Sequence, residues 1–448
     1  MRLVFKPGPE PVAFSGVCMA KRLTCGWGCL CVAAAAQLAW AAGAAPAPVR
    51  SAAPDWPQWR GPCRDGISAE TGLLQAWPEG GPKLLWKASG IGKGYSSPIV
   101  AGDSVYVTGD QDKELAIRAF ALDGRPRWAA SNGAPWKGSY PGARASCAFD
   151  DGRLYQLNAH GRLACLDAAT GGDVWSVNVL ERFGGTNILW GISESVLVHG
   201  GLVFATPAGA QGLVVALDKR TGAPVWVTPA IEGERASYSS PLLIDAGARQ
   251  LLANCGSRHA FAVDAATGAL VWQLPHLDPK NTVNMTPVLA GPMLVFNNSS
   301  RDFGALFGVP LDGGGPSRAW TCELKVGHGG MVCLNGRLYG ASGKGALTGW
   351  VSVDAKTGQV SQAAPAAALP DGSAVLADGR LYGLTSKGTM TLQEVTDAGF
   401  KVAGSFQLAE GKVQDAWAHP VVCKGRLFLR FHDTLFCYDV RRAGNAER

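Results

Sequence analysis

Short apolar stretches alternate with polar, glycine-containing turns along most of the chain. Residues 146–179 show the pattern clearly. The apolar stretches are SCAF, LYQLN, LACLD and DVWSV, and each of the three turns between them contains glycine. Apolar stretches of this length, bounded by turn residues, predict short antiparallel strands joined by tight turns. The pattern therefore favours repeated four-stranded meanders.

A motif of the form Asp-x-x-Thr-Gly followed by Trp recurs about every 45 residues, a period typical of β-propeller blades. Its clearest copies occupy 166–175, 217–226 and 263–272, and looser copies occupy 122–128, 311–320 and 353–360. The Asp side chain can accept hydrogen bonds from turn amides, and Gly supplies the left-handed backbone of the turn. We expect the Trp ring to pack between neighbouring blades, with its N–H bonded to a nearby acceptor.

The repeats predict an all-β fold, an eight-bladed β-propeller of four-stranded antiparallel sheets, over residues 81–442. The eight blades start at 97, 146, 195, 240, 286, 330, 373 and 419. The last copy, 419–442, lacks a fourth strand, whereas 84–88 looks like a fourth strand with no preceding three. Pairing the two segments completes the last blade and leaves no open sheet edge.

The two ends of the chain lie outside this repeat. Lys21 and Arg22 precede the apolar run 29–42, and small residues follow it, so residues 1–47 are predicted to be a signal peptide, with Met19 as an alternative start. The apolar run is shorter than the roughly 20 residues that span a bilayer, which favours cleavage over anchoring. We expect an exported, periplasmic or envelope-associated protein without a membrane span. Residues 48–80 are rich in Pro and Gly and predict an extended cap, and 443–448 form a tail.

Charge and cysteine content narrow the range of functions. The chain carries 41 basic and 35 acidic residues; without the four basic residues and one acid before residue 47 the balance is 37 − 34 = +3. No Lys/Arg run exceeds two residues, which argues against a nucleic-acid partner. Cys165 and Cys437 occupy equivalent positions of distant blades, so they cannot form a disulfide with each other. Most thiols are expected to be small buried side chains.

The repeats resemble those of the pyrroloquinoline-quinone (PQQ) repeat superfamily, which includes quinoprotein alcohol dehydrogenases and BamB-type proteins. The similarity runs from about 55 to 442, and DWPQWRGPCRDG, WPEGGPKLLW and GYSSP resemble the opening of exported PQQ-like propellers. The resemblance implies an eight-bladed ring. The chain lacks the adjacent cysteines and the C-x-x-C-H haem motif of quinoprotein dehydrogenases, and no contiguous motif supplies calcium ligands. PQQ with calcium is therefore not firmly implied, and no other metal site is predicted.

The residue two positions before each blade start should face the central funnel. These positions hold Tyr95, Arg144, Ser193, Tyr238, Asn284, His328, Asp371 and Trp417, with Glu194 and His419 beside them. Aromatic faces for stacking and Arg144 for a carboxylate would suit a small polar, planar ligand. In the alternative interpretation these side chains close the channel and bond to loop backbones or water.

Three functions are compatible with this ring. The first is a non-enzymatic binding or scaffold module that holds a protein or cell-envelope component through its funnel and face loops. The second is a PQQ-dependent alcohol or sugar dehydrogenase, in which Asp371, Glu194 or His419 acts as the base and Arg144 polarises a quinone oxygen. The third is a carbohydrate-binding propeller that stacks sugars on Tyr95, Tyr238 and Trp417. The repeat motif itself is structural and selects none of them.

Overall fold

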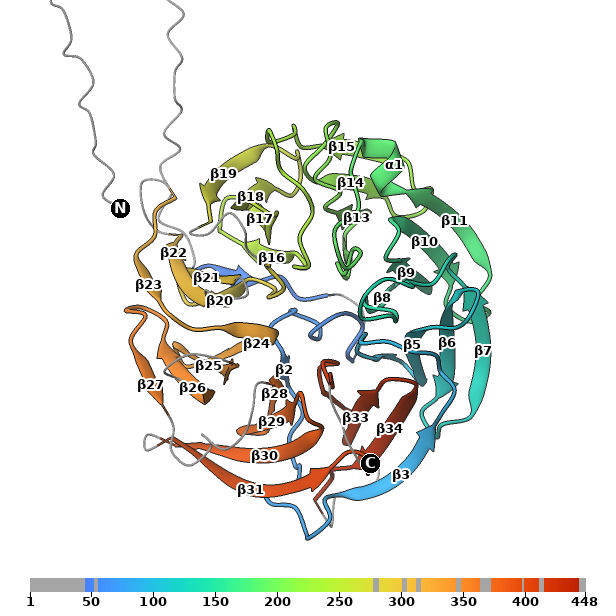
Figure 1. The fold of residues 1–448 in the computed structure, drawn as a ribbon, viewed down its shortest axis with the longest axis vertical. Coiled ribbons are helices and arrows are strands. Elements are labelled where there is room, and N and C mark those ends of the chain that lie inside the picture. Colours follow the sequence, from blue (N-terminus) through green and yellow to red (C-terminus); the bar gives the residue numbers. More distant parts are fainter. Residues whose placement is uncertain are drawn as a thin grey trace, which may run out of the picture. The chain divides into compact units, whose positions relative to one another are not determined.

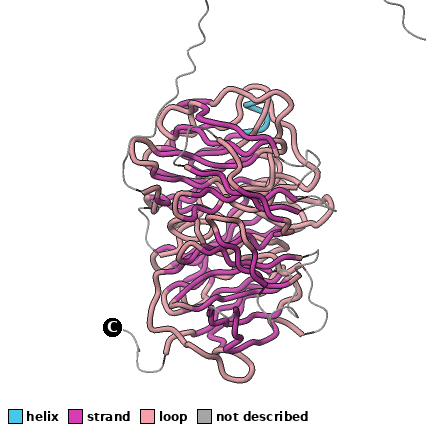
Figure 2. Tube along the Cα trace, turned by 90° about the vertical axis from the view of Figure 1, so that its left-hand side faces the viewer, coloured by secondary structure: helices cyan, strands magenta, loops and turns pink. Residues whose placement is uncertain are grey.

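The computed structural model describes residues 45–51, 55–276, 282–299, 304–311, 316–343, 348–362, 372–396, 399–410 and 415–442. Eight small sheets form a ring, and most of their strands follow one another in the chain (Figure 1). Strands dominate the regular structure (Figure 2), and the described residues include one short helix, α1 (Val179–Phe183). The predicted eight-bladed β-propeller is confirmed. The predicted leader up to residue 44, the tail 443–448 and Asp371 lie outside the described residues.

The first four blades follow the chain from residue 99 to residue 275. Blade 1 contains β4 (Ile99–Ala101), β5 (Ser104–Asp110), β6 (Leu115–Ala121) and β7 (Pro126–Ser131). Blade 2 contains β8 (Ala148–Asp150), β9 (Arg153–Leu157), β10 (Arg162–Asp167) and β11 (Asp173–Asn178). Blade 3 contains β12 (Leu197–His199), β13 (Leu202–Ala205), β14 (Val215–Asp218) and β15 (Pro224–Val227). Blade 4 contains β16 (Leu242–Asp245), β17 (Gln250–Cys255), β18 (His259–Asp264) and β19 (Leu270–Pro275), and β1 (Ala47–Pro48) pairs with β16.

The remaining blades continue the same meander. Blade 5 contains β20 (Val288–Ala290), β21 (Met293–Ser299), β22 (Gly304–Pro310) and β23 (Trp320–Cys322). Blade 6 contains β24 (Val326–Leu334), β25 (Arg337–Ser342), β26 (Gly349–Asp354) and β27 (Val360–Gln362). Blade 7 contains β28 (Gly372–Ala377), β29 (Arg380–Thr385), β30 (Thr389–Thr396) and β31 (Gly399–Gln407), and β2 (Ile67–Ser68) pairs with β28. Blade 8 contains β32 (Val421–Cys423), β33 (Arg426–Phe431), β34 (Thr434–Asp439) and β3 (Lys83–Ala88).

Blade 8 closes the ring because its outermost strand comes from the other end of the propeller segment. β3 pairs antiparallel with β34, from Lys83 opposite Asp439 to Ala88 opposite Leu435. In Figure 1 the blue β3 lies beside the red β34. The closure predicted for 84–88 is therefore confirmed, and it joins the two ends of the propeller segment in one blade.

The repeated motif holds several blades against the next one. In blade 3, Asp218 Oδ1 accepts hydrogen bonds from the Thr221 amide and hydroxyl, both at 2.9 Å, and this closes the turn. Trp175 of blade 2 packs on the Gly222 of that turn, where an added Cβ would lie 2.6 Å from the ring, and its Nε1 donates to the Lys219 carbonyl at 3.0 Å. Trp86, Trp128 and Trp320 donate to the following blade in the same way, through Leu122, Ala168 and Ala355.

The hydrophobic core is shared between neighbouring blades. One cluster joins Tyr155 and Leu163 of blade 2 to Val203 and Leu217 of blade 3, all nearly or fully buried. Each sheet therefore buries both faces, and the core extends around the ring blade by blade.

Residues 55–68 cross the centre of the ring, and we call this segment the plug (Figure 1). Its Arg64 donates to the carbonyls of Ser195 at 2.6 Å and Val196 at 3.1 Å, at the start of blade 3. Its Arg60 donates to the Met331 carbonyl of blade 6 at 2.5 Å. The plug therefore ties together blades that lie across the ring from each other.

Candidate functional site

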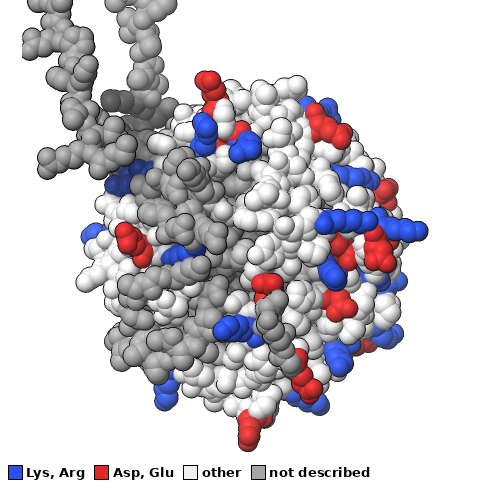
Figure 3. Space-filling view, in the orientation of Figure 1, with Lys and Arg blue, Asp and Glu red and all other residues white. Residues whose placement is uncertain are grey.

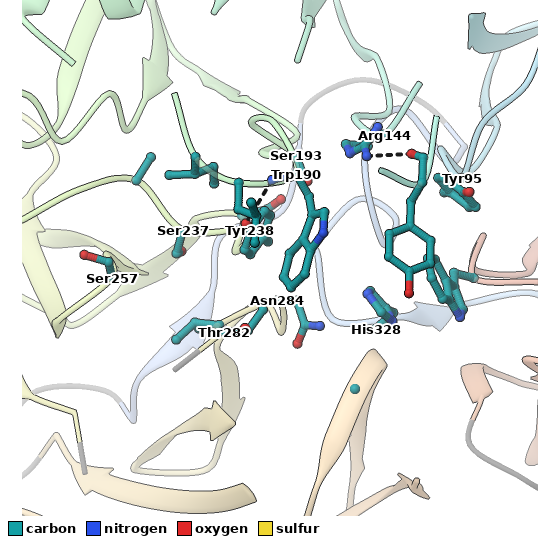
Figure 4. Close-up of a pocket in the computed structure, with 18 of the residues that line it drawn as sticks. Tyr95, Arg144, Trp190, Ser193, Ser237, Tyr238, Ser257, Thr282, Asn284 and His328 are labelled. Carbon is teal, nitrogen blue, oxygen red and sulfur yellow. Dashed lines mark hydrogen bonds between the residues drawn. The ribbon is translucent and has the colours of Figure 1, made fainter. Parts of the chain in front are cut away.

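A cavity of about 1000 Å³ lies at the centre of the ring, and Trp59 reaches into it from the plug. Side chains from the loops that lead into the first strands of most blades line it (Figure 4). Three kinds of group dominate: aromatic rings, hydroxyl and amide groups, and three cations, Arg144, Arg235 and Lys325. Among the described residues that line the cavity, none is an aspartate or a glutamate.

The structure brings most of the predicted funnel residues together in this cavity. Tyr95, Arg144, Ser193, Tyr238, Asn284, His328 and Trp417 all line it. Glu194 and His419 do not line it, and both are buried behind its wall. Asp371 lies outside the described residues, so its place in this site stays a prediction.

A chain of aromatic rings runs around part of the cavity wall. Tyr238 and Trp190 have ring centroids 5.5 Å apart, Trp190 and Tyr140 6.4 Å, Tyr140 and Trp417 5.3 Å. Trp417 in turn stacks on His328 at 4.1 Å. The Trp190 amide also donates to the Tyr238 hydroxyl at 3.3 Å. We call these five residues the aromatic belt, which offers a ligand a broad apolar surface with polar edges.

Arg144 organises the loop that carries Tyr140. Its guanidinium donates to the carbonyls of Ser139, Tyr140 and Gly142, with 2.7 Å between Nη2 and the Tyr140 oxygen, and it lies over the Trp136 ring. Figure 4 shows its bond to a loop carbonyl. Burial lowers the pKa of Arg144, opposed mainly by the nearby Tyr95 hydroxyl. Arg144, which was predicted to bind a ligand carboxylate, therefore uses at least some of its N–H donors to bond the protein's own backbone.

Arg235 is held differently. Its amide lies 3.2 Å from both Glu234 Oε1 and Ser257 Oγ, which accept from it. Glu234 also accepts from the Ser257 hydroxyl at 2.9 Å and the Arg258 amide at 2.7 Å, and it pairs with His259 Nδ1 at 2.7 Å. The buried Glu234 carboxylate thus fixes the backbone of a loop whose next side chain, Arg235, borders the cavity.

Glu194 lies in a site unsuited to a catalytic base. Its Oε2 accepts from the Thr206 amide at 3.1 Å, and burial raises its pKa to about 8, opposed by the Thr206 bond and the nearby Arg64. At neutral pH the protonated form is favoured, and a protonated carboxyl cannot accept a proton from a substrate.

His419 is also held away from the cavity, because the plug covers it. Its Nε2 donates to the His328 carbonyl at 2.9 Å, and its ring lies 4.5 Å from that of Trp59. Burial and, to a lesser extent, the charge of Arg60 lower its pKa to about 3. His419 is therefore neutral and packs between the plug and blade 8.

Sequence reasoning missed several residues that line the cavity. Trp59, Tyr140, Trp190, Arg235 and Lys325 occupy no repeated position of the blade motif. Trp59 enters through the plug and donates to the Thr286 hydroxyl at 2.9 Å, a contact between residues 227 positions apart. The concentration of Trp and Tyr in the loops between blades is the only sequence signal for Tyr140 and Trp190, and no signal marks Arg235 or Lys325.

The described lining does not fit a calcium-bound quinone. Calcium sites in proteins usually include several carboxylate oxygens, whereas the described wall offers hydroxyl and amide groups without a carboxylate, beside three cations. Within the described ranges, no group of three or more His, Cys, Asp or Glu side chains is placed to hold a metal ion. All eight cysteines of these ranges are free, so no disulfide lies against the cavity.

The exposed surface carries charges of both signs. Basic and acidic side chains are interspersed around the rim of the face shown in Figure 3.

No helix among the described residues is both long and apolar enough to cross a membrane.

Comparisons with known proteins identify relatives of this fold. The family model described as outer membrane protein assembly factor BamB matches residues 112–364, more than half of the chain. No curated protein matches in a sequence search. BamB from Moraxella catarrhalis superposes with a TM-score of 0.58 at 16% identity, covering 82% of this chain and 99% of that one. The quinohemoprotein alcohol dehydrogenase from Comamonas testosteroni superposes with a TM-score of 0.64 at 15% identity, covering 88% of this chain and 82% of that one. The computationally designed Ika8 protein superposes with a TM-score of 0.56 at 10% identity, covering 80% of this chain and 100% of that one. At these identities the solved structures support the fold alone.

Proposed function

Because the chain belongs to the family of the outer membrane protein assembly factor BamB, we propose that it is an exported binding or scaffold propeller. It holds a partner protein or cell-envelope component through its central cavity and the loops around it. The leader pattern of residues 1–47 supports export. The observation that carries the proposal is the cavity itself, lined by an aromatic belt and three cations and closed toward the plug by Trp59.

The same cavity supports binding better than dehydrogenase chemistry. A quinoprotein dehydrogenase needs a base beside the substrate and a divalent cation on the quinone. Glu194 is buried away from the cavity with its pKa raised to about 8, and the described lining has no carboxylate. Arg144 donates to loop carbonyls. A rigid aromatic surface with cations at its edge instead matches the composition of protein-binding sites, which are enriched in Trp, Tyr and Arg.

The experiment selects ligands without assuming their identity. The purified protein is panned against a random decapeptide display library, and selected peptides are tested on Trp190→Ala and on the matched control Val225→Ala. Val225 is an apolar residue of the outer strand β15, 56% exposed and absent from the cavity lining. We expect peptides whose binding falls about tenfold or more in Trp190→Ala, as for a central aromatic anchor, and is unchanged in Val225→Ala.

A second arm tests the dehydrogenase. The protein is equilibrated with PQQ and Ca²⁺, desalted, and assayed for quinone absorbance and for dye reduction with simple alcohols. We expect no retained absorbance. Retained quinone with alcohol-dependent dye reduction would overturn the proposed function, and so would a library that yields no peptide dependent on Trp190.

A further inference from the structure

The central cavity has a charge and shape from which its ligand class can be deduced, given the proposed binding function. We propose that it takes an acidic peptide segment that carries an aromatic side chain. The carboxylates would meet the cations of the wall, and the aromatic ring would pack on the aromatic belt.

The charge of the wall is the first observation. Arg144, Arg235 and Lys325 line the cavity, and its described lining contains no carboxylate. Glu234, the carboxylate beneath Arg235, is directed to Ser257, Arg258 and His259. The Arg235 side chain makes no hydrogen bond or ion pair with another described residue, and the residue is exposed. A wall that carries three cations and no described carboxylate attracts anions, and guanidinium groups pair well with carboxylates.

The position of Arg235 is fixed, which makes it a suitable anchor. Its backbone amide is bonded to Glu234 and Ser257, both at 3.2 Å, and Ser257 itself lines the cavity. Two residues further along, the Ser237 hydroxyl donates to the Cys255 carbonyl at 2.7 Å. The loop is therefore tied to the end of β17 and to the turn after it, so that binding needs little further ordering of the backbone.

The apolar rim of the cavity favours a peptide over a small molecule. Leu189 is 75% exposed and Tyr140 47% exposed, and both border the cavity beside Trp190. The cavity volume of about 1000 Å³ already lies at the upper end of small-molecule sites, which span about 300–1000 Å³. An exposed apolar lip on such a cavity extends the contact surface outward, as a chain segment that enters the cavity from a partner would need.

The test measures binding of a fluorescein-labelled decapeptide of alternating aspartate and phenylalanine by fluorescence anisotropy. Two altered peptides serve as comparisons: one with asparagine for aspartate and one with serine for phenylalanine. We expect each altered peptide to bind about tenfold more weakly or worse, and binding of the acidic peptide to weaken with added salt.

Protein variants assign the effect to the wall. Arg235→Ala should weaken binding of the acidic peptide about tenfold, because it removes one charge-assisted contact. Arg220→Ala is the matched control, since Arg220 is an exposed arginine on an outer turn and absent from the cavity lining. Both variants should keep the wild-type circular dichroism spectrum and melting temperature.

The outcomes separate this inference from the proposed function. Equal binding of the aspartate and asparagine peptides, or equal affinities of Arg235→Ala and Arg220→Ala, would overturn the acidic ligand but leave a binding propeller in place. Full competition by free phenylpropionate at the affinity of the peptide would overturn the peptide as occupant. If no decapeptide binds and PQQ is retained, both proposals fall.

Discussion

Two tryptophans at the same motif position differ in one hydrogen bond. Comparing them therefore measures how much that bond contributes to the stability of the contact between adjacent blades. Trp175 and Trp226 each pack on the glycine of the next blade, with an added Cβ at 2.6 Å from the ring for Gly222 and 2.4 Å for Gly268. Trp175 Nε1 donates to the Lys219 carbonyl at 3.0 Å, whereas the buried Trp226 Nε1 has no acceptor among the described residues. The perturbation is Trp→Phe at each position.

The expected difference follows from this contrast. Both substitutions lose a similar apolar area, so that loss cancels in the comparison. Trp175→Phe also loses a hydrogen bond with a net contribution of about 1 kcal/mol, while Trp226→Phe removes an unpaired buried donor that costs about 1 kcal/mol or more. The Lys219 carbonyl keeps the Tyr155 hydroxyl at 3.0 Å, so no acceptor is left unpaired. We therefore expect Trp175→Phe to be the more destabilising change by about 2 kcal/mol in sum.

Urea unfolding followed by far-ultraviolet circular dichroism measures both variants without relying on tryptophan fluorescence. The wild-type protein and both variants should share one m-value, so that differences in midpoint report stability. Equal losses in the two variants, or a larger loss in Trp226→Phe, would refute the reasoning that the N–H bond helps to hold adjacent blades together.

Three further predictions concern the buried polar groups. Burial raises the pKa of Glu194 from 4.5 to about 8, so its contribution to stability is present below pH 4.5 and is lost as the pH rises toward 8. The unfolding free energy of the wild-type protein should therefore fall between pH 5 and 8, and Glu194→Gln should flatten this fall. Parallel curves of unfolding free energy against pH for the two proteins would contradict this. Arg64→Met removes the donors to the Ser195 and Val196 carbonyls and should cost about 3 kcal/mol in urea unfolding, against almost nothing for the exposed Arg220→Met. Burial raises the pKa of Cys147 to about 12, so iodoacetamide at pH 8 should label this thiol only after unfolding; rapid labelling of the folded protein, detected by peptide mass spectrometry, would contradict its burial.

The fold could be predicted from the sequence because its determinants are local. The Asp218 turn is closed by contacts with Thr221, three residues away, and each docking Trp meets a glycine in the next copy of the same motif. Such interactions repeat with the sequence, so the number of blades and the closure by β3 could be deduced from spacing. The route of the plug could not, because it depends on bonds such as Arg64 to Ser195, between residues 131 positions apart.

The site was predictable only where it follows the repeat. Ser193 lines the cavity but the next residue, Glu194, is buried behind it, since successive side chains of an extended backbone point to opposite sides. His419 lies two residues beyond Trp417, in the same loop before β32, and its ring packs against that of Trp59. Arg235 and Tyr140 lie on loops without a repeated pattern, and no spacing in the sequence indicates that their side chains converge.

Hydrogen–deuterium exchange with and without the acidic aromatic peptide tests most directly whether the central cavity is the binding site. If it is, the loops 136–144, 186–193, 233–238 and 415–419 should become protected at saturating peptide, while the outer strands β7, β11 and β15 should exchange as before. Protection of the outer strands, with unchanged exchange in the loops around the cavity, would contradict the account.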